Sequence, residues 1–209
     1  MKSSNQPDSC LRPPQVLARW LSRPSLLGGL ALFAMICVLG DSSIVHGQQS
    51  KPSEYEVKAA YLYNFGRFVE WPNKVASSAG DSFSICVLGE DPFGRILGAL
   101  AGQTIGGKQV VAKRISKPLD ASNCRIVFIS LSEEKQLNDT LVTLGKVGVL
   151  TVSDMPQFSQ RGGMIQFVLE GNKVRFEINL TAAENAGLTL SSELLKVATA
   201  VRKSSQSGD

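Results

Sequence analysis

Residues 162–180, with the sequence GGMIQFVLEGNKVRFEINL, are expected to form the β-hairpin around which the rest of the chain packs. A two-residue loop at Gly171 and Asn172 would suit the positive φ angles that tight hairpin turns require. Because side chains alternate along a strand, this loop places three apolar pairs on one face: Leu169 with Val174, Phe167 with Phe176, and Ile165 with Ile178. A shift of one residue would move Phe176 to the other face, so the pattern fixes the pairing.

The opposite face of this hairpin is half polar, and it is the face on which we expect a function. Arg175 and Glu177 share it and are candidates for contact with a ligand or a protein partner. A second candidate is a set of apolar residues with no obvious role in the core, which we expect to bind a partner: Met155, Phe158, Met164 and Val168. Exposed apolar patches are typical of interaction surfaces. The alternative is that Met155 and Phe158 cover the sheet.

The first 47 residues have the pattern of a secretory leader. Basic residues precede an uncharged, mostly apolar run at 26–39, which has the length of a signal sequence and is short for a membrane span. Val45 and Gly47 suit a cleavage site that would leave Gln48 as the new N-terminus. An uncleaved N-terminal anchor is the alternative. We therefore expect a signal peptide at 1–47, one domain at 48–202 and a disordered polar tail at 203–209.

Removal of this leader restricts the chemistry that the protein can perform. The only histidine, His46, lies in the leader, so the remainder cannot use a Ser-His-Asp or Cys-His site or a histidine-ligated metal. The leader contains four of the chain's 22 basic residues and two of its 18 acidic residues, so 18 basic and 16 acidic residues remain. A net charge of +2 is too small to indicate nucleic-acid binding. No two carboxylates have a periodic reason to face each other. We expect no catalytic residue, no metal and no cofactor.

Short apolar runs alternate with helical segments along the middle of the chain. Strands are expected at residues 83–88, 109–115, 125–131 and 147–152, with a helix over 133–144 that Ser132 caps. A capping box at Thr181 and Glu184 and a last helix at 191–202 follow the hairpin. Strands separated by helices are typical of parallel crossovers. The predicted fold is a single-domain α/β layered sandwich, with a mixed sheet of parallel crossovers and a C-terminal antiparallel hairpin, flanked by helices.

The domain is expected to begin with a helix. Ser53 and Glu56 have capping-box spacing, apolar residues recur at helical spacing up to Phe68, and Trp71-Pro72 stops the helix. Asn64 and Arg67 fall outside the apolar stripe. They are further candidates for contact with a ligand or partner, and a solvated helix edge is the alternative.

Four separate blocks of this sequence resemble the YfiR-like family of periplasmic regulators (DUF4154). The blocks are YEVKAAYLYNF with FVEWP at 55–72, CVLG with DPFG at 86–94, RGGMI at 161–165, and VRFEIN at 174–179. They occur in the family's order over nearly the whole predicted domain. The resemblance implies a compact α/β sandwich, often dimeric, with no enzymatic activity.

The resemblance also implies a mode of action. Such proteins bind the periplasmic sensor domain of an inner-membrane diguanylate cyclase with a GGDEF domain and hold it inactive, which controls cyclic di-GMP signalling. An OmpA-like outer-membrane lipoprotein can sequester them. Two alternatives stay open: a periplasmic module that binds a small molecule and reports to a membrane receptor, and an enzyme that uses carboxylates.

Cys86 and Cys124 are the two cysteines that remain after the leader, and we expect them to form a disulfide. Thiols exported to an oxidising compartment normally become paired. Cys86 lies within one predicted strand and Cys124 opens another, so neighbouring strands would bring them within bonding range. The resemblance agrees, since Cys86 lies in a matching block. Some relatives have a second cysteine pair later in the domain, which this chain lacks. The alternative is two buried free thiols.

Overall fold

The structure, a computed structural model, describes residues 51–72 and 82–203, all within the compact unit Ser50–Asp209. The predicted leader with its cleavage site, and the predicted tail beyond Lys203, lie outside the described residues.

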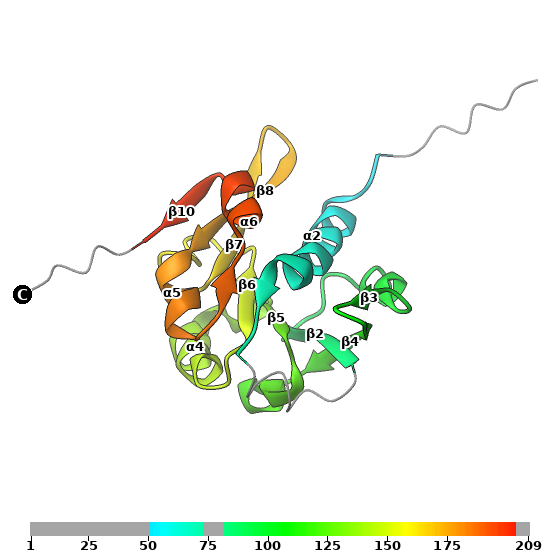
Figure 1. The fold of residues 1–209 in the computed structure, drawn as a ribbon, viewed down its shortest axis with the longest axis horizontal. Helices are drawn as coiled ribbons and strands as arrows, with labels where there is room; N and C mark the ends of the chain where they lie inside the picture. Colours follow the sequence, from blue (N-terminus) through cyan, green and yellow to red (C-terminus); the bar gives the residue numbers. More distant parts are fainter. Residues whose placement is uncertain (1–50, 73–81, 204–209) are drawn as a thin grey trace, which may run out of the picture. The chain divides into compact units, whose positions relative to one another are not determined.

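A curled sheet of eight strands, in the order β10-β8-β7-β6-β5-β2-β4-β3, is the framework of the fold (Figure 1). Its strands are β2 (Ser82–Leu88), β3 (Thr104–Ile105), β4 (Lys108–Ile115), β5 (Ile126–Ile129), β6 (Leu150–Ser153), β7 (Ile165–Glu170), β8 (Lys173–Asn179) and β10 (Ala200–Arg202). The central pairs, from β4 through β2, β5 and β6 to β7, are parallel, whereas β7 with β8 and β3 with β4 are antiparallel. The sheet is therefore mixed, as predicted. Two short strands, β1 (Val69–Glu70) and β9 (Thr189–Leu190), pair separately.

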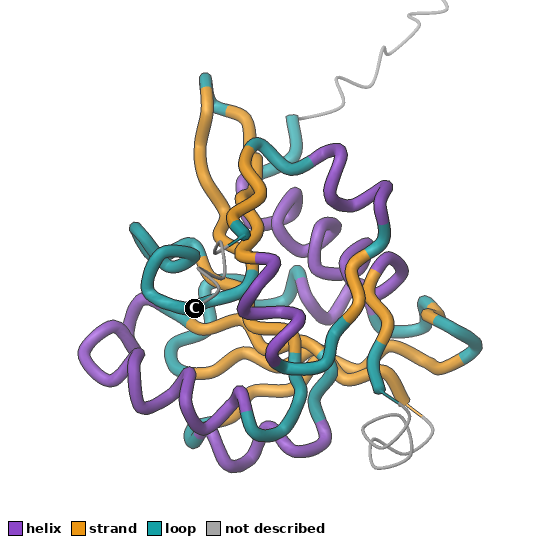
Figure 2. Tube along the Cα trace, turned by 60° about the vertical axis from the view of Figure 1, so that its left-hand side comes forward, coloured by secondary structure: helices purple, strands orange, loops and turns teal. Residues whose placement is uncertain are grey.

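Helical segments cover both faces of this sheet (Figure 2). One face is covered by α2 (Glu54–Phe68), α5 (Leu180–Asn185), α6 (Ser192–Val197) and the 3-10 helix η1 (Leu97–Leu100). The other carries α4 (Leu137–Gly145) with the 3-10 helices η2 (Pro118–Asn123) and η3 (Leu131–Gln136). Alternation along β2 shows why two cores form, because Ile85 and Val87 enter the first core while Cys86 and Leu88 enter the second. The predicted layered α/β sandwich is confirmed.

The hairpin has the predicted pairing throughout. Phe167 lies opposite Phe176, Ile165 opposite Ile178, and Glu170 opposite Lys173. Gly171 and Asn172 form the loop with φ values of 53° and 60°, the positive values that tight hairpin loops favour. In Figure 1 the tip of this hairpin projects beyond its neighbours, because β6 pairs with β7 only at Ile165 and Gln166.

The first helix also begins where the sequence predicts. The Ser53 hydroxyl accepts a hydrogen bond from the Glu56 amide at 3.3 Å, and the Glu56 carboxylate accepts one from the Ser53 amide at 2.6 Å. This reciprocal capping box satisfies two of the donors that a helix start leaves open. The helix ends at Phe68, and Val69 continues as a strand.

Three local predictions about later elements are wrong. The predicted helix at 191–202 ends at Val197, and the following residues form β10, because the Thr199 amide donates to the Phe176 carbonyl at 2.9 Å and fills part of the open edge of β8. Ser132 does not cap a helix; its hydroxyl accepts from the Glu90 amide at 3.0 Å, and the segment begins as 3-10 helix. Asn179, not Thr181, caps α5.

None of the helices among the described residues has the length and the apolar character needed to cross a bilayer.

Candidate functional site

A buried cluster of charges fixes the start of α2 to the end of β6. The Lys58 ammonium lies 2.6 Å from Asp154 Oδ2 and 2.5 Å from Glu54 Oε1, and the Lys58 residue is only 2% exposed. Tyr55 donates a hydrogen bond to the same Asp154 oxygen at 3.1 Å, and the ammonium stands 4.4 Å from the centre of the Tyr55 ring. Sequence reasoning did not identify this cluster. The spacing of Glu54 and Lys58 suits a helical ion pair, but nothing local points to Asp154.

The cluster changes the proton affinities of its members. Burial alone would lower the pKa of Lys58, because it disfavours the charged form. Hydrogen bonds to Asp154 and Glu54 outweigh this effect of burial, so the pKa of Lys58 is raised. Burial, followed by the negative charge of Asp154, raises the pKa of Tyr55. Both groups therefore hold their protons more strongly in the folded protein than in the unfolded chain.

Four aromatic rings join α2 to the hairpin. Phe65 meets Phe176 edge to face at 5.1 Å between ring centres and stacks on Phe167 at 5.8 Å. Tyr61 completes the group, with its ring 5.3 Å from that of Phe176 and its hydroxyl 3.5 Å from the Val174 carbonyl. Tyr61 thus stands at the boundary between the core and two surface cavities.

The first of these cavities, the α2–α6 groove, has a volume of about 290 Å³. It is lined by Tyr61, Phe65 and Phe176 together with other residues of α2 and α6: Asn64, Arg67, Phe68, Glu193, Leu194 and Val197. Val197 is an apolar side chain that is 62% exposed. The structure brings the predicted candidates Asn64 and Arg67 together here.

The second, the hairpin cavity, lies between the start of α2 and the tip of the hairpin and has a volume of about 500 Å³. It is lined by Lys51, Pro52, Glu54, Val57, Tyr61, Leu169, Asn172, Lys173, Val174 and Arg175. The predicted candidate Arg175 therefore borders this cavity, and Tyr61 is shared with the α2–α6 groove.

The predicted partner surface around Met155 and Phe158 is wrong, because both side chains are fully buried in the second core. The Phe158 ring occupies the space in front of Gly163, where any Cβ atom would collide with it. Met164 is also buried, at 4% exposure, and Val168 is half-buried opposite Arg175. Met155 and Phe158 therefore cover the sheet and close the second core, which is the alternative that the sequence left open.

Glu177, the remaining candidate, belongs to a polar network beneath the same loop. Its carboxylate lies 3.1 Å from the Ser159 hydroxyl and 3.5 Å from the Arg202 guanidinium. The Gln166 amide oxygen accepts from the Ser159 amide at 3.0 Å, and the Asn179 amide group donates to the Ser159 carbonyl at 2.8 Å. These bonds tie the loop to β7 and β8 and engage Glu177, whereas Arg175 borders the hairpin cavity.

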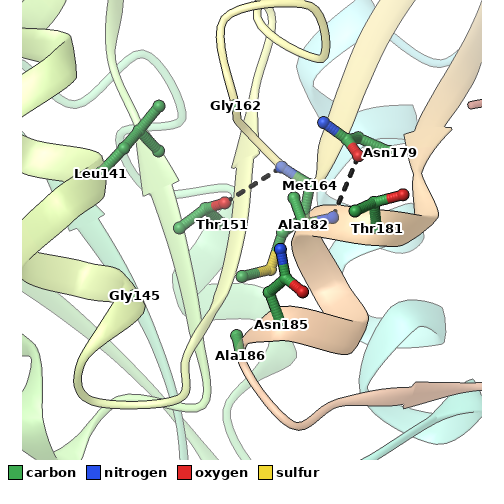
Figure 3. A pocket seen from close by; sticks show the side chains of 10 residues that line it. All are labelled: Leu141, Gly145, Thr151, Gly162, Met164, Asn179, Thr181, Ala182, Asn185 and Ala186. Atoms are coloured by element: carbon green, nitrogen blue, oxygen red, sulfur yellow. Dashed lines mark hydrogen bonds between the residues drawn. The ribbon is translucent and has the colours of Figure 1, made fainter. Parts of the chain in front are cut away.

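Figure 3 shows a further pocket, of about 390 Å³, between α4 and α5. Its lining side chains are neutral, and Met164 lies at its floor, where its amide donates to the Thr151 hydroxyl at 3.1 Å. Among the described residues, no three His, Cys, Asp or Glu side chains gather in a way that could hold a metal ion.

Cys86 and Cys124 form a disulfide, as predicted. Cys86 points from β2 into the second core, and Cys124 follows η2 at the entrance to β5. Their Cα atoms are 6.0 Å apart, within the range that a disulfide requires. Both residues are at most 1% exposed, so the bond lies in the interior.

One solved structure has a similar fold. A conserved domain protein from Vibrio cholerae O1 biovar El Tor strain N16961 has a solved structure with 15% identity and a TM-score of 0.50, which covers 73% of this chain. This chain spans 62% of that protein's length. An ABC domain from Streptococcus pneumonia, solved in complex with L-Trp, has 10% identity and a TM-score of 0.42, with 62% and 58% of the two chains covered.

The comparison of sequences with protein families is more specific. The pattern of the YfiR/HmsC-like family matches residues 55–199, which include all but the first residue of α2, both cores and the hairpin. The chain belongs to the YfiR/HmsC-like family.

Proposed function

We propose that this protein is a non-enzymatic regulator of cyclic di-GMP signalling in the periplasm. It binds the periplasmic sensor domain of an inner-membrane diguanylate cyclase and holds that enzyme inactive. The observation that carries this proposal is the family match over residues 55–199. Sequestration of the regulator by an OmpA-like outer-membrane lipoprotein would relieve the repression.

The disulfide supports a location outside the cytoplasm. Disulfides persist in oxidising compartments such as the periplasm and are rare in the cytosol. Cys86 and Cys124 are at most 1% exposed, so a partner thiol has little access to the bond. The bond therefore suits a structural role that is established after export.

We place the contact with the cyclase at the α2–α6 groove. Val197 exposes 62% of its surface there, and Val201, on the following strand, exposes 41%. Arg67 and Glu193 border the groove with charges of both signs. An apolar centre with a charged rim is the usual composition of a protein interface. Asn64 and Arg67 are then contact residues on this surface.

The experiment is deletion of the gene, followed by complementation and measurement of cellular cyclic di-GMP. Deletion should raise the cyclic di-GMP level, and the wild-type chain should restore it. Val197→Asp should fail to restore it, because a carboxylate would be desolvated in the contact. The matched control is Val142→Asp on α4, since Val142 is 64% exposed and lies on the other face of the sheet.

The outcomes distinguish failure of the proposed function from failure of the assigned surface. Co-purification with the isolated sensor domain tests the contact itself: the wild type and Val142→Asp should retain the domain, and Val197→Asp should not. An unchanged cyclic di-GMP level after deletion would refute the proposed function. Repression by Val197→Asp equal to that by Val142→Asp, at equal protein levels, would instead refute the assigned surface alone.

A further inference from the structure

The hairpin cavity combines positive charge with apolar surface in a way that the proposed partner contact does not use. Three basic side chains border it: Lys51, Lys173 and Arg175. Within the part of the chain that the structure describes, none of them has an ion pair or a hydrogen bond from its side chain. Among the described residues that line the cavity, the one acid, Glu54, is already bound to Lys58. The cavity therefore has an excess of positive charge.

The backbone of β8 adds a hydrogen-bond donor to the same cavity. Glu170 and Lys173 flank the two-residue loop as a hydrogen-bonded pair, so the next pair, Leu169 with Val174, does not exchange bonds across the hairpin. The amide and carbonyl of Val174 then point outward. The Tyr61 hydroxyl donates to that carbonyl at 3.5 Å, which places the outward edge on the cavity side. β10 pairs only with residues 177–179 and leaves the edge at Val174 uncovered.

The remaining lining is apolar and partly open to solvent. Leu169 is 59% exposed, although it belongs to the apolar face of the hairpin. Pro52, Val57 and the Tyr61 ring line the opposite wall. Leu169 therefore adds exposed apolar surface to a cavity that also has basic side chains.

We propose that the hairpin cavity binds a small molecule that has one anionic head group and an apolar tail or ring. Lys173, Arg175 and the Val174 amide would hold the carboxylate or phosphate head, because charge-assisted bonds to such groups are the strongest available here. Leu169, Val57 and the Tyr61 ring cover the apolar part. A volume of about 500 Å³ lies within the range of small-molecule sites in proteins. This inference stands independently of the proposed repression of a cyclase.

The test is calorimetric titration of the purified protein with octanoate and with octyl phosphate. Octylamine and octanol, which lack the negative charge, and inorganic phosphate, which lacks the tail, are titrated in parallel. We expect saturable binding of the two anionic amphiphiles and binding at least about tenfold weaker for the other three, since one lost charged contact is worth about that factor. Higher salt should weaken the binding.

Two double variants with equal loss of charge locate the site. Lys173→Gln/Arg175→Gln should reduce the affinity by about tenfold or more, whereas Lys146→Gln/Lys196→Gln, which changes exposed lysines elsewhere, should leave it unchanged. Leu169→Ser should weaken octanoate and leave inorganic phosphate unaffected. Absence of saturable binding, equal binding of octylamine, or equal affinities of the two double variants would each overturn the proposal.

Discussion

Lys58 keeps its charge at 2% exposure because two carboxylates and an aromatic ring replace the water that it has lost. Desolvating a charge is costly unless it is paired, and removing one member of a buried pair leaves the others uncompensated. We predict that Lys58→Met lowers the free energy of unfolding by about 3 kcal/mol, at the low end for buried pairs because Glu54 is partly exposed. Urea denaturation measures this change.

A second variant identifies the cause of that loss. Glu54→Gln/Asp154→Asn added to Lys58→Met removes the unpaired carboxylates and should recover most of the stability. If Lys58→Met alone costs no more than an exposed lysine substitution such as Lys196→Met, the cluster contributes nothing.

The same cluster predicts how stability changes at alkaline pH. The pKa values of Lys58 and Tyr55 are raised in the folded protein above their usual 10.5 and 10.0. The folded state therefore binds these protons more strongly than the unfolded state, and the resulting stability is present below pH 10 and is lost as the pH rises through the folded-state values. The free energy of unfolding should fall more steeply above pH 10 for the wild type than for Tyr55→Phe/Lys58→Met. Parallel curves for the two proteins would contradict this.

At the scale of the element, the hairpin divides into a buried base and an exposed tip although its apolar face is continuous in sequence. Phe176 is 1% exposed, whereas Leu169, on the same face, is 59% exposed. Phe176→Ala should therefore cost about 3–5 kcal/mol through the lost transfer energy and the cavity left behind. Leu169→Ala, measured in the same urea experiment, should cost much less. Similar losses from both would mean that the tip is covered in solution.

Elements that depend on local pattern could be predicted from sequence, and those that depend on distant partners could not. The hairpin pairing and the capping box at Ser53 follow from residue spacing alone, and both were predicted correctly. The last helix was predicted too long, because residues 200–202 follow a helical pattern but complete the open edge of β8. Tertiary pairing outweighs local helix propensity there.

The candidate site was predictable only in part, for the same reason. Asn64 and Arg67 stood out as polar residues beside the apolar stripe of a helix, and Arg175 as a residue on the half-polar face of the hairpin. All three border the two cavities next to Tyr61. Met155 and Phe158 were misassigned to the surface, because a loop that folds back over a sheet leaves no periodic signal of its burial.

At the scale of the whole molecule, the disulfide joins the two parts of the sequence that build the second core. The Cys86–Cys124 bond closes a loop with a separation of 38 residues, which includes β4 and η2. The chain-entropy estimate for such a loop lies between about 3 and 4.7 kcal/mol. The stability of the domain therefore depends on where it folds, since this contribution requires an oxidising compartment.

The proposed leader at residues 1–47 should direct export of the protein. In the wild type, N-terminal sequencing of periplasmic protein should begin at Gln48, and a non-reduced digest should contain the linked Cys86 and Cys124 peptides. A chain that starts at Gln48 after an initiator methionine should stay in the cytoplasm with both thiols reduced, melt at a lower temperature, and fail to repress the cyclase. Oxidation of that purified chain should restore the melting temperature of the exported protein. Recovery of intact residues 1–47 in the membrane fraction would show an anchor instead, and a disulfide formed equally well in the cytoplasm would remove the link between export and stability.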